Sequence, residues 1–157
     1  METRVIVSAI IQKGDYILLG KKAKGRPPYP DVWHLLGGGV EDEFQRQAIE
    51  LIEQGDYNNM LFIKNLEREV WEESRIEIKS IQNICPKYRT TPRETKTNNK
   101  YGVLTHYIFL EYLCEYKSGK PTPNDDIKEV KWVDKRNLPN VQVTKPSHEM
   151  YKELGWI

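Results

Sequence analysis

Hydrophobic and polar residues follow two different periods along this chain. Apolar, often β-branched runs with strand-like patterning occupy six segments: 5–11, 16–19, 33–36, 76–84, 101–116 and 129–134. Apolar residues at three- and four-residue spacing mark helices in three further segments: 43–54, about 59–74 and about 144–155. The turn signal Lys13-Gly14-Asp15 joins the first two strands into a hairpin. Strands therefore flank a central helix and another helix closes the chain, which predicts an α+β or mixed α/β fold, layered around one sheet.

Two segments break these periods and are predicted to be loops. Residues 23–31 contain three prolines and a glycine, and residues 86–100 are polar, with five basic side chains against one acid. Long loops of this kind often carry function, although disorder is the simpler interpretation of the second. With 157 residues, no internal repeat and no linker, the chain is expected to form one domain, residues 1–157, around one core.

Composition and charge narrow the class of protein. Hydrophobic residues make up 38% and charged residues 30%, which is typical of a globular protein, and no apolar run approaches the ~20 residues that span a bilayer. The formal charge of +1 argues against the nucleic-acid backbone as main partner, because such proteins usually carry a clear positive excess. Cys85 and Cys114 lie in apolar runs and are interpreted as buried thiols, and no secretory pattern opens the chain. We therefore expect a cytoplasmic protein.

Residues 66–76 carry the most informative side chains. Glu69, Glu72 and Glu73 stand at i, i+3 and i+4, so a helix projects all three from one face. A divalent cation turns the repulsion among such carboxylates into attraction, and hard oxygen ligands suit Mg²⁺ or Mn²⁺. An acidic string of this kind is also common on solvated helices. Its context favours the functional interpretation, because a tryptophan, three consecutive glycines and an acidic run precede it.

Together, residues 37–43 and 68–76 resemble the Nudix box, the motif G-x5-E-x7-R-E-U-x-E-E-x-G-U with U an aliphatic residue. The stretch Arg-Glu-Val-Trp-Glu-Glu at 68–73 matches the R-E-U-x-E-E core at every position, and residues 33–38 are similar to the W-x-x-P-G-G sequence of this family. Leu36 and Arg75 replace the usual proline and glycine. The spacer between Glu43, the candidate first glutamate, and Arg68 is far longer than in the pattern, which predicts a helical insertion at about 45–60.

The resemblance implies a fold, a cofactor and roles for individual residues. The fold would be a Nudix-like α/β/α sandwich around a mixed sheet, and the cofactor Mg²⁺ or Mn²⁺. Glu72 and Glu73 would bind the metal, and Glu69 would support them or act in proton transfer. A carbonyl near Gly38 would add a ligand, and Arg68 would hold a carboxylate in its rotamer. The expected catalytic residues are therefore Arg68, Glu69, Glu72 and Glu73.

Three acids near the late strand are candidates for a further ligand or base. Asp125, Asp126 and Glu129 stand where many relatives of this family place another carboxylate. We favour Glu129 or Asp126, while an ordinary turn is the alternative for the two aspartates.

Aromatic and basic residues are candidates for substrate binding. The rings of Trp33 and Tyr29 could stack on a nucleobase, and Arg89 could grip a phosphate. A solvated loop is the simpler interpretation of Arg89. His34, beside Trp33, is expected to line the pocket.

The resemblance implies a metal-dependent hydrolase, in which water attacks phosphorus and cleaves a diphosphate linkage in a nucleoside di- or triphosphate or a related nucleotide derivative. A second hypothesis keeps the metal site but has dinucleoside polyphosphates or nucleotide sugars as substrates. A third is a catalytically silent nucleotide-binding module, although such modules usually lose box glutamates and this chain keeps the triplet. The expected partner is a small nucleotide, with neither membrane nor nucleic acid. The oligomeric state is open, a homodimer included.

Overall fold

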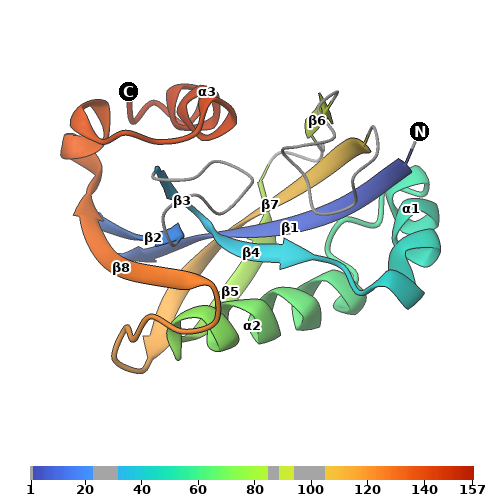
Figure 1. Ribbon diagram of the computed structural model, residues 1–157, viewed down its shortest axis with the longest axis horizontal. Coiled ribbons are helices and arrows are strands. Elements are labelled where there is room, and N and C mark those ends of the chain that lie inside the picture. The colour runs from blue at the N-terminus through green and yellow to red at the C-terminus, as the bar shows by residue number, and fades with distance from the viewer. Residues whose placement is uncertain (1, 23–31, 85–88, 94–104) are drawn as a thin grey trace.

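The computed structural model describes residues 2–22, 32–84, 89–93 and 105–157. Figure 1 shows a layered arrangement. Helices α1 (Gln45–Glu53) and α2 (Met60–Ser74) pack on one face of a central sheet, and helix α3 (Lys145–Glu153) covers the other. The expected α/β/α sandwich around a mixed sheet is confirmed.

The described strands of the sheet are β1 (Glu2–Lys13), β2 (Tyr16–Lys22), β3 (Trp33–His34), β4 (Leu36–Gly39), β5 (Glu77–Asn83), β6 (Arg89–Arg93), β7 (Thr105–Ser118) and β8 (Ile127–Asp134). Two short 3-10 helices, η1 (Asp42–Phe44) and η2 (Lys135–Asn140), precede α1 and follow β8. Each segment that periodicity predicted as strand or helix is present within the described residues, which omit 101–104 of the predicted strand 101–116.

The structure corrects the sequence-based prediction in two places. The predicted strand 33–36 is two strands, and β4 continues through all three glycines. Residues 89–93, predicted to be loop, form β6, because β7 extends beyond β5 and offers an edge to which a polar segment can pair through its backbone. The predicted loop 23–31 and the rest of 86–100 lie outside the described residues.

Strand β1 organises the sheet. One of its edges pairs in parallel with β7, from Glu2↔Thr105 to Gln12↔Glu115. Its other edge is shared, because β4 pairs antiparallel with residues 6–9 and β2 pairs with the last two residues of the strand. β2 continues away from β1 to pair with β3 and β8, which leaves room beside β1 for the glycine strand β4.

The buried stripe of α2 decides which face of the helix remains for polar residues. Phe62, Leu66 and Val70 are fully buried against the sheet, and burying each such side chain contributes roughly 1.5–3 kcal/mol.

Asn59 caps the helix, since its side chain accepts a hydrogen bond from the Leu61 N–H at 2.9 Å. The helix start predicted near residue 59 is confirmed.

Cys114 is buried in β7, where burial raises the pKa of its thiol to about 12, as expected for an inert thiol. Cys85 lies outside the described residues.

No helix within the described segments is long and apolar enough to cross a membrane.

Candidate active site

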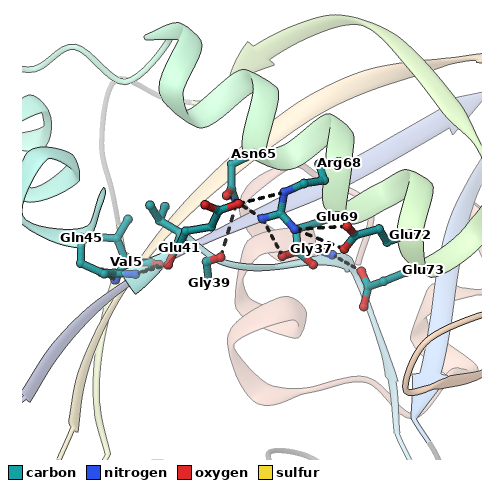
Figure 2. Close-up of polar contacts among 11 residues, drawn as sticks. Val5, Gly37, Gly39, Glu41, Gln45, Asn65, Arg68, Glu69, Glu72 and Glu73 are labelled. Carbon is teal, nitrogen blue, oxygen red and sulfur yellow. Dashed lines mark hydrogen bonds and ion pairs between the residues drawn. The ribbon is translucent and has the colours of Figure 1, made fainter. Parts of the chain in front are cut away.

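The two halves of the interrupted motif meet in the fold. β4 lies beside α2, and the backbone N–H of Gly37 donates a hydrogen bond to Glu73 Oε1 over 2.8 Å (Figure 2). Gly38 faces Glu69 so closely that a Cβ at Gly38 would stand 2.7 Å from the Glu69 carboxylate. The glycines and the glutamates, which α1 separates in the sequence, are therefore neighbours in space.

Arg68 links the carboxylates to one another. Its guanidinium lies 3.3 Å from Glu69 Oε1 and 3.2 Å from Glu72 Oε2, and it donates a hydrogen bond to Asn65 Oδ1 over 2.9 Å (Figure 2). A fourth contact of 3.5 Å joins Arg68 Nε to Glu41 Oε1, from the segment that follows β4. Partly exposed ion pairs add little stability singly, so the main effect of this network is to restrict side-chain rotamers. The geometry supports a positioning role for Arg68.

Glu73 is held where ionisation is costly. The residue is only 5% exposed, and burial raises the pKa of its carboxyl well above the ordinary value. The hydrogen bond from Gly37 opposes this rise, whereas the charges of Glu69 and Asp126 add to it.

The pKa of the Glu69 carboxyl is raised for the same reason as that of Glu73. Burial raises the pKa of its carboxyl, Arg68 opposes the rise, and the charges of Glu72 and Asp125 add to it. The Glu69 side chain is 16% exposed and that of Glu72 is 42% exposed. Burial is thus the main obstacle to ionisation of Glu69 and Glu73, neighbouring acids add to it, and a bound cation would favour the charged carboxylates.

We expect the raised pKa of the Glu73 carboxyl to appear in the pH dependence of stability. A carboxyl whose folded-state pKa is raised stabilises the fold below its unfolded pKa and loses that contribution as pH rises through the folded value. In metal-free buffer the free energy of unfolding of the wild type should fall as pH rises above the ordinary value of 4.5, and Glu73→Gln should show a smaller fall. Urea denaturation of both proteins across this range measures the difference, and parallel curves would contradict the prediction.

The oxygen donors at this position fit a divalent cation. Glu69, Glu72 and Glu73 place carboxylates beside the backbone of β4, and carboxylate and carbonyl oxygens are the hard ligands that Mg²⁺ and Mn²⁺ prefer. Within the described residues, no three His, Cys, Asp or Glu side chains already converge closely enough to hold an ion, and Arg68 engages two of the glutamates instead.

The loop after β7 brings two more acids to the C-terminal end of α2. Asn124 donates hydrogen bonds from its backbone N–H to the Glu73 carbonyl at 3.0 Å and from Nδ2 to the Glu72 carbonyl at 2.9 Å. These bonds satisfy carbonyls that the end of a helix leaves without partners. They also fix Asp125 and Asp126 nearby, where the charge of Asp125 raises the pKa of the partly buried Glu69 and that of Asp126 raises the pKa of the buried Glu73. Glu129 is exposed on β8, opposite Lys21 of β2, and its part in the site stays a prediction.

The structure describes the side chain of one of the three residues predicted to bind substrate. Trp33 is partly buried on β3, and its ring centroid lies 4.2 Å from Lys131 Nζ and 5.6 Å from Lys21 Nζ. Tyr29 lies outside the described residues, and Arg89 opens β6 with a side chain that also lies outside them. The substrate-binding roles of all three stay predictions.

His34 has a defined tautomer. Its Nδ1 donates to the Leu35 carbonyl over 2.7 Å, so Nε2 carries the lone pair. Burial lowers the pKa of the imidazole, and Nε2 is buried without a hydrogen-bond partner among the described residues. The charges of Lys22 and Asp126 act on this ring and on Glu73 alike, so His34 lies in the same electrostatic neighbourhood as the glutamates.

Two polar residues of the site were missed from the sequence. Glu41 contacts Arg68, whereas Glu43, the candidate obtained by counting along the motif, is exposed in η1. Asn65 joins Arg68 to the Gly39 carbonyl of β4. Its position one helical turn before Glu69 is a signal that could have identified it.

The sequence profile of the NUDIX domain matches residues 2–154. The chain therefore belongs to the Nudix family, which confirms the resemblance of its box. Two curated relatives are both named nucleoside triphosphatase NudI. The protein from Klebsiella pneumoniae (strain 342) is 26% identical over 156 residues, or 99% of each chain. The protein from Salmonella agona (strain SL483) is 30% identical over 139 residues, or 88% of this chain and 86% of its own.

Solved structures and the enzyme class agree with this assignment. The MutT NUDIX hydrolase from Burkholderia pseudomallei matches with a TM-score of 0.67 at 22% identity, covering 97% of this chain and 98% of that one, which shows a shared fold. Nudix hydrolases cleave diphosphate linkages in nucleotide derivatives and in general use divalent metals. The expected class, a Nudix pyrophosphohydrolase, is confirmed.

Proposed function

We propose that this protein hydrolyses nucleoside triphosphates, with Mg²⁺ held by Glu72 and Glu73 and with Glu69 supporting them or acting in proton transfer. The proposal depends above all on one observation: Gly37 donates to Glu73 while Gly38 packs on Glu69, so the box is assembled despite its interruption. The two curated relatives, which match most of the chain, are named nucleoside triphosphatases, and this supports the substrate class.

The burial and contacts of each residue support separate roles in metal binding and proton transfer. Glu73, anchored by Gly37, and the more exposed Glu72 are proposed as metal ligands, with the Gly38 carbonyl as a further one. Arg68 engages Oε1 of Glu69, so we assign proton transfer to Glu69 Oε2. Burial raises the pKa of this carboxyl, which is the direction that favours its accepting a proton. When bound, the cation supplies neutralisation of diphosphate charge and lowers the pKa of water.

A nucleotide panel tests the substrate class. The purified protein with Mg²⁺ should consume nucleoside triphosphates faster than dinucleoside polyphosphates or nucleotide sugars, as measured by anion-exchange separation of the products. Faster turnover of either alternative would reassign the substrate. Binding without turnover of any nucleotide would favour the silent nucleotide-binding module.

Removing divalent cations is expected to lower activity by at least about 100-fold, because the glutamates alone offer no positive charge to the diphosphate. Rates are measured in excess chelator and again after Mg²⁺ or Mn²⁺ is added back separately, which identifies the preferred ion. Full activity in excess chelator would rule out the proposed mechanism.

We also propose that residues 1–157 form one domain, in which about 45–60 are an insertion packed on the core through Ala48 and Ile52 of α1. The cytoplasmic location and the oligomeric state, a homodimer included, stay predictions. Light scattering on the purified protein measures the latter.

A further inference from the structure

Helix α1 separates the two halves of the box in the sequence, yet side chains from α1 and α2 hold the end of β4 and the residue that follows it. Figure 1 places α1 near the start of β1, beyond the end of β4. Two buried side-chain amides contact the end of β4 and its surroundings: Gln45 at the start of α1 bonds to Val5 and Val40, and Asn65 inside α2 bonds to Gly39 (Figure 2). Neither position belongs to the residues that the box pattern specifies.

Gln45 continues the backbone ladder between β1 and β4. The residue is 7% exposed, and its Oε1 accepts from the Val5 N–H over 2.7 Å. Its Nε2 donates to the Val40 carbonyl over 2.7 Å and to the Val5 carbonyl over 3.2 Å. The Val40 N–H itself donates to the Val5 carbonyl over 3.0 Å. The amide thus acts like one more strand residue and closes the end of β4 that leads into α1.

Asn65 connects the same strand to the guanidinium of the site. The residue is 8% exposed, its Oδ1 accepts from Arg68 Nη2 over 2.9 Å, and its Nδ2 donates to the Gly39 carbonyl over 3.4 Å. Both ends of the amide face groups of complementary polarity. Because Arg68 also contacts Glu69 and Glu72, its guanidinium connects Asn65 to both carboxylates.

We propose that Gln45 and Asn65 are positioning residues, which hold β4 and Arg68 in register across the interruption of the box. A short spacer restricts the distance between glycines and helix through the chain itself, whereas the long spacer 44–67 leaves that distance to core packing, strand pairing and polar contacts such as these. A misplacement of about 1 Å in a supporting group can cost roughly 100-fold in rate, so these contacts matter for turnover. The inference rests on the proposed function of the site.

Matched variants distinguish an effect on the position of β4 and Arg68 from a general loss of fold stability. Asn65→Leu and Gln45→Met each remove the amide with little change in side-chain size. Asn59→Ala is the control, because it removes the N-cap of α2 and weakens the same helix without a contact to β4 or Arg68. For each protein we would measure kcat and KM, the dissociation constant of Mn²⁺ by electron paramagnetic resonance, thermal unfolding, and hydrogen exchange of the 37–40 backbone.

We expect Asn65→Leu and Gln45→Met to lower kcat about 10- to 100-fold with little change in KM, to weaken Mn²⁺ binding, and to speed exchange at Gly37. Asn65→Asp keeps the acceptor facing Arg68 but replaces the donor to Gly39 with a charged acceptor, so it should keep the Arg68 contact, lose the contact to β4, and recover part of the loss. Asn59→Ala should lower the melting temperature and leave kcat and Mn²⁺ binding unchanged well below that temperature.

If Asn65→Leu and Gln45→Met resemble Asn59→Ala in kcat and Mn²⁺ binding, the amides are merely structural and the proposal is wrong. Should Gln45→Met fail to fold, the two Asn65 variants decide the result. Mn²⁺ binding and hydrogen exchange do not depend on the nucleotide. A wild type that hydrolyses no nucleoside triphosphate would therefore overturn the proposed substrate while these comparisons still test the positioning role.

Discussion

Glutamine in place of Glu73 is expected to lower kcat by at least about 100-fold while the fold is retained. The variant removes the negative charge proposed to bind the cation, but its amide oxygen can still accept the hydrogen bond that Gly37 donates over 2.8 Å. Because burial raises the pKa of the Glu73 carboxyl, a neutral side chain is also easier to bury there than a carboxylate. The variant should thus lose activity while its folded state remains as stable as that of the wild type or becomes more stable.

Steady-state rates with Mg²⁺ and circular dichroism of the same preparation test this expectation. Glu67→Gln is the matched control, because Glu67 is exposed on the same helix and the same change of charge there should leave kcat unaltered. Glu72→Gln should behave like Glu73→Gln. Wild-type turnover by a folded Glu73→Gln protein would overturn the metal-binding assignment.

Alanine at each of the three glycines of β4 is expected to give three different outcomes. A Cβ at Gly37 would lie 2.1 Å from the Val7 carbonyl oxygen, at a φ of 152°, so Gly37→Ala should destabilise the fold by about 3 kcal/mol or more. A Cβ at Gly38 would meet the Glu69 carboxylate at 2.7 Å, and that flexible side chain can move away. Gly38→Ala should therefore fold and lose about 10- to 100-fold in kcat.

Gly39→Ala is the internal control of this series, because the nearest atom to its Cβ would be the Val5 oxygen, 4.0 Å away. It should change neither stability nor rate substantially. Urea denaturation and kcat for the three variants provide the measurement. Equal loss of activity at Gly38 and Gly39 would show that the contact between Gly38 and Glu69 has no special part in turnover.

Part of the site could be predicted because it depends on local properties of the chain. The spacing of Glu69, Glu72 and Glu73 places them on one helical face whatever the helix packs against. The polar Asn59 before an apolar stripe is equally a local signal, and it marked the start of α2 to within a residue. Strand positions were predicted for the same reason, since alternating or continuous apolar runs report how a segment will be buried.

Other parts could not be predicted because they depend on partners distant in the chain. Residues 89–93 have the composition of a loop, and they form β6 only because β7 provides a backbone edge. Counting along the motif led to Glu43, whereas the path of the chain after β4 brings Glu41 to Arg68. A buried Gln45 looks from the sequence like any polar residue of a helix, and its role appears only where β1 and β4 end together.

The sequence by itself determined the central helix, its acidic face and, through the Arg-Glu-Val-Trp-Glu-Glu core, the family to which the chain belongs. The helical period and the helix cap are properties of neighbouring residues, so no further information was needed. Only the tertiary structure decided that Gly37 and Gly38 meet Glu73 and Glu69 across the interruption. Contacts between segments so far apart depend on how strands pair and how α1 packs, and the spacing of residues in the sequence does not contain them.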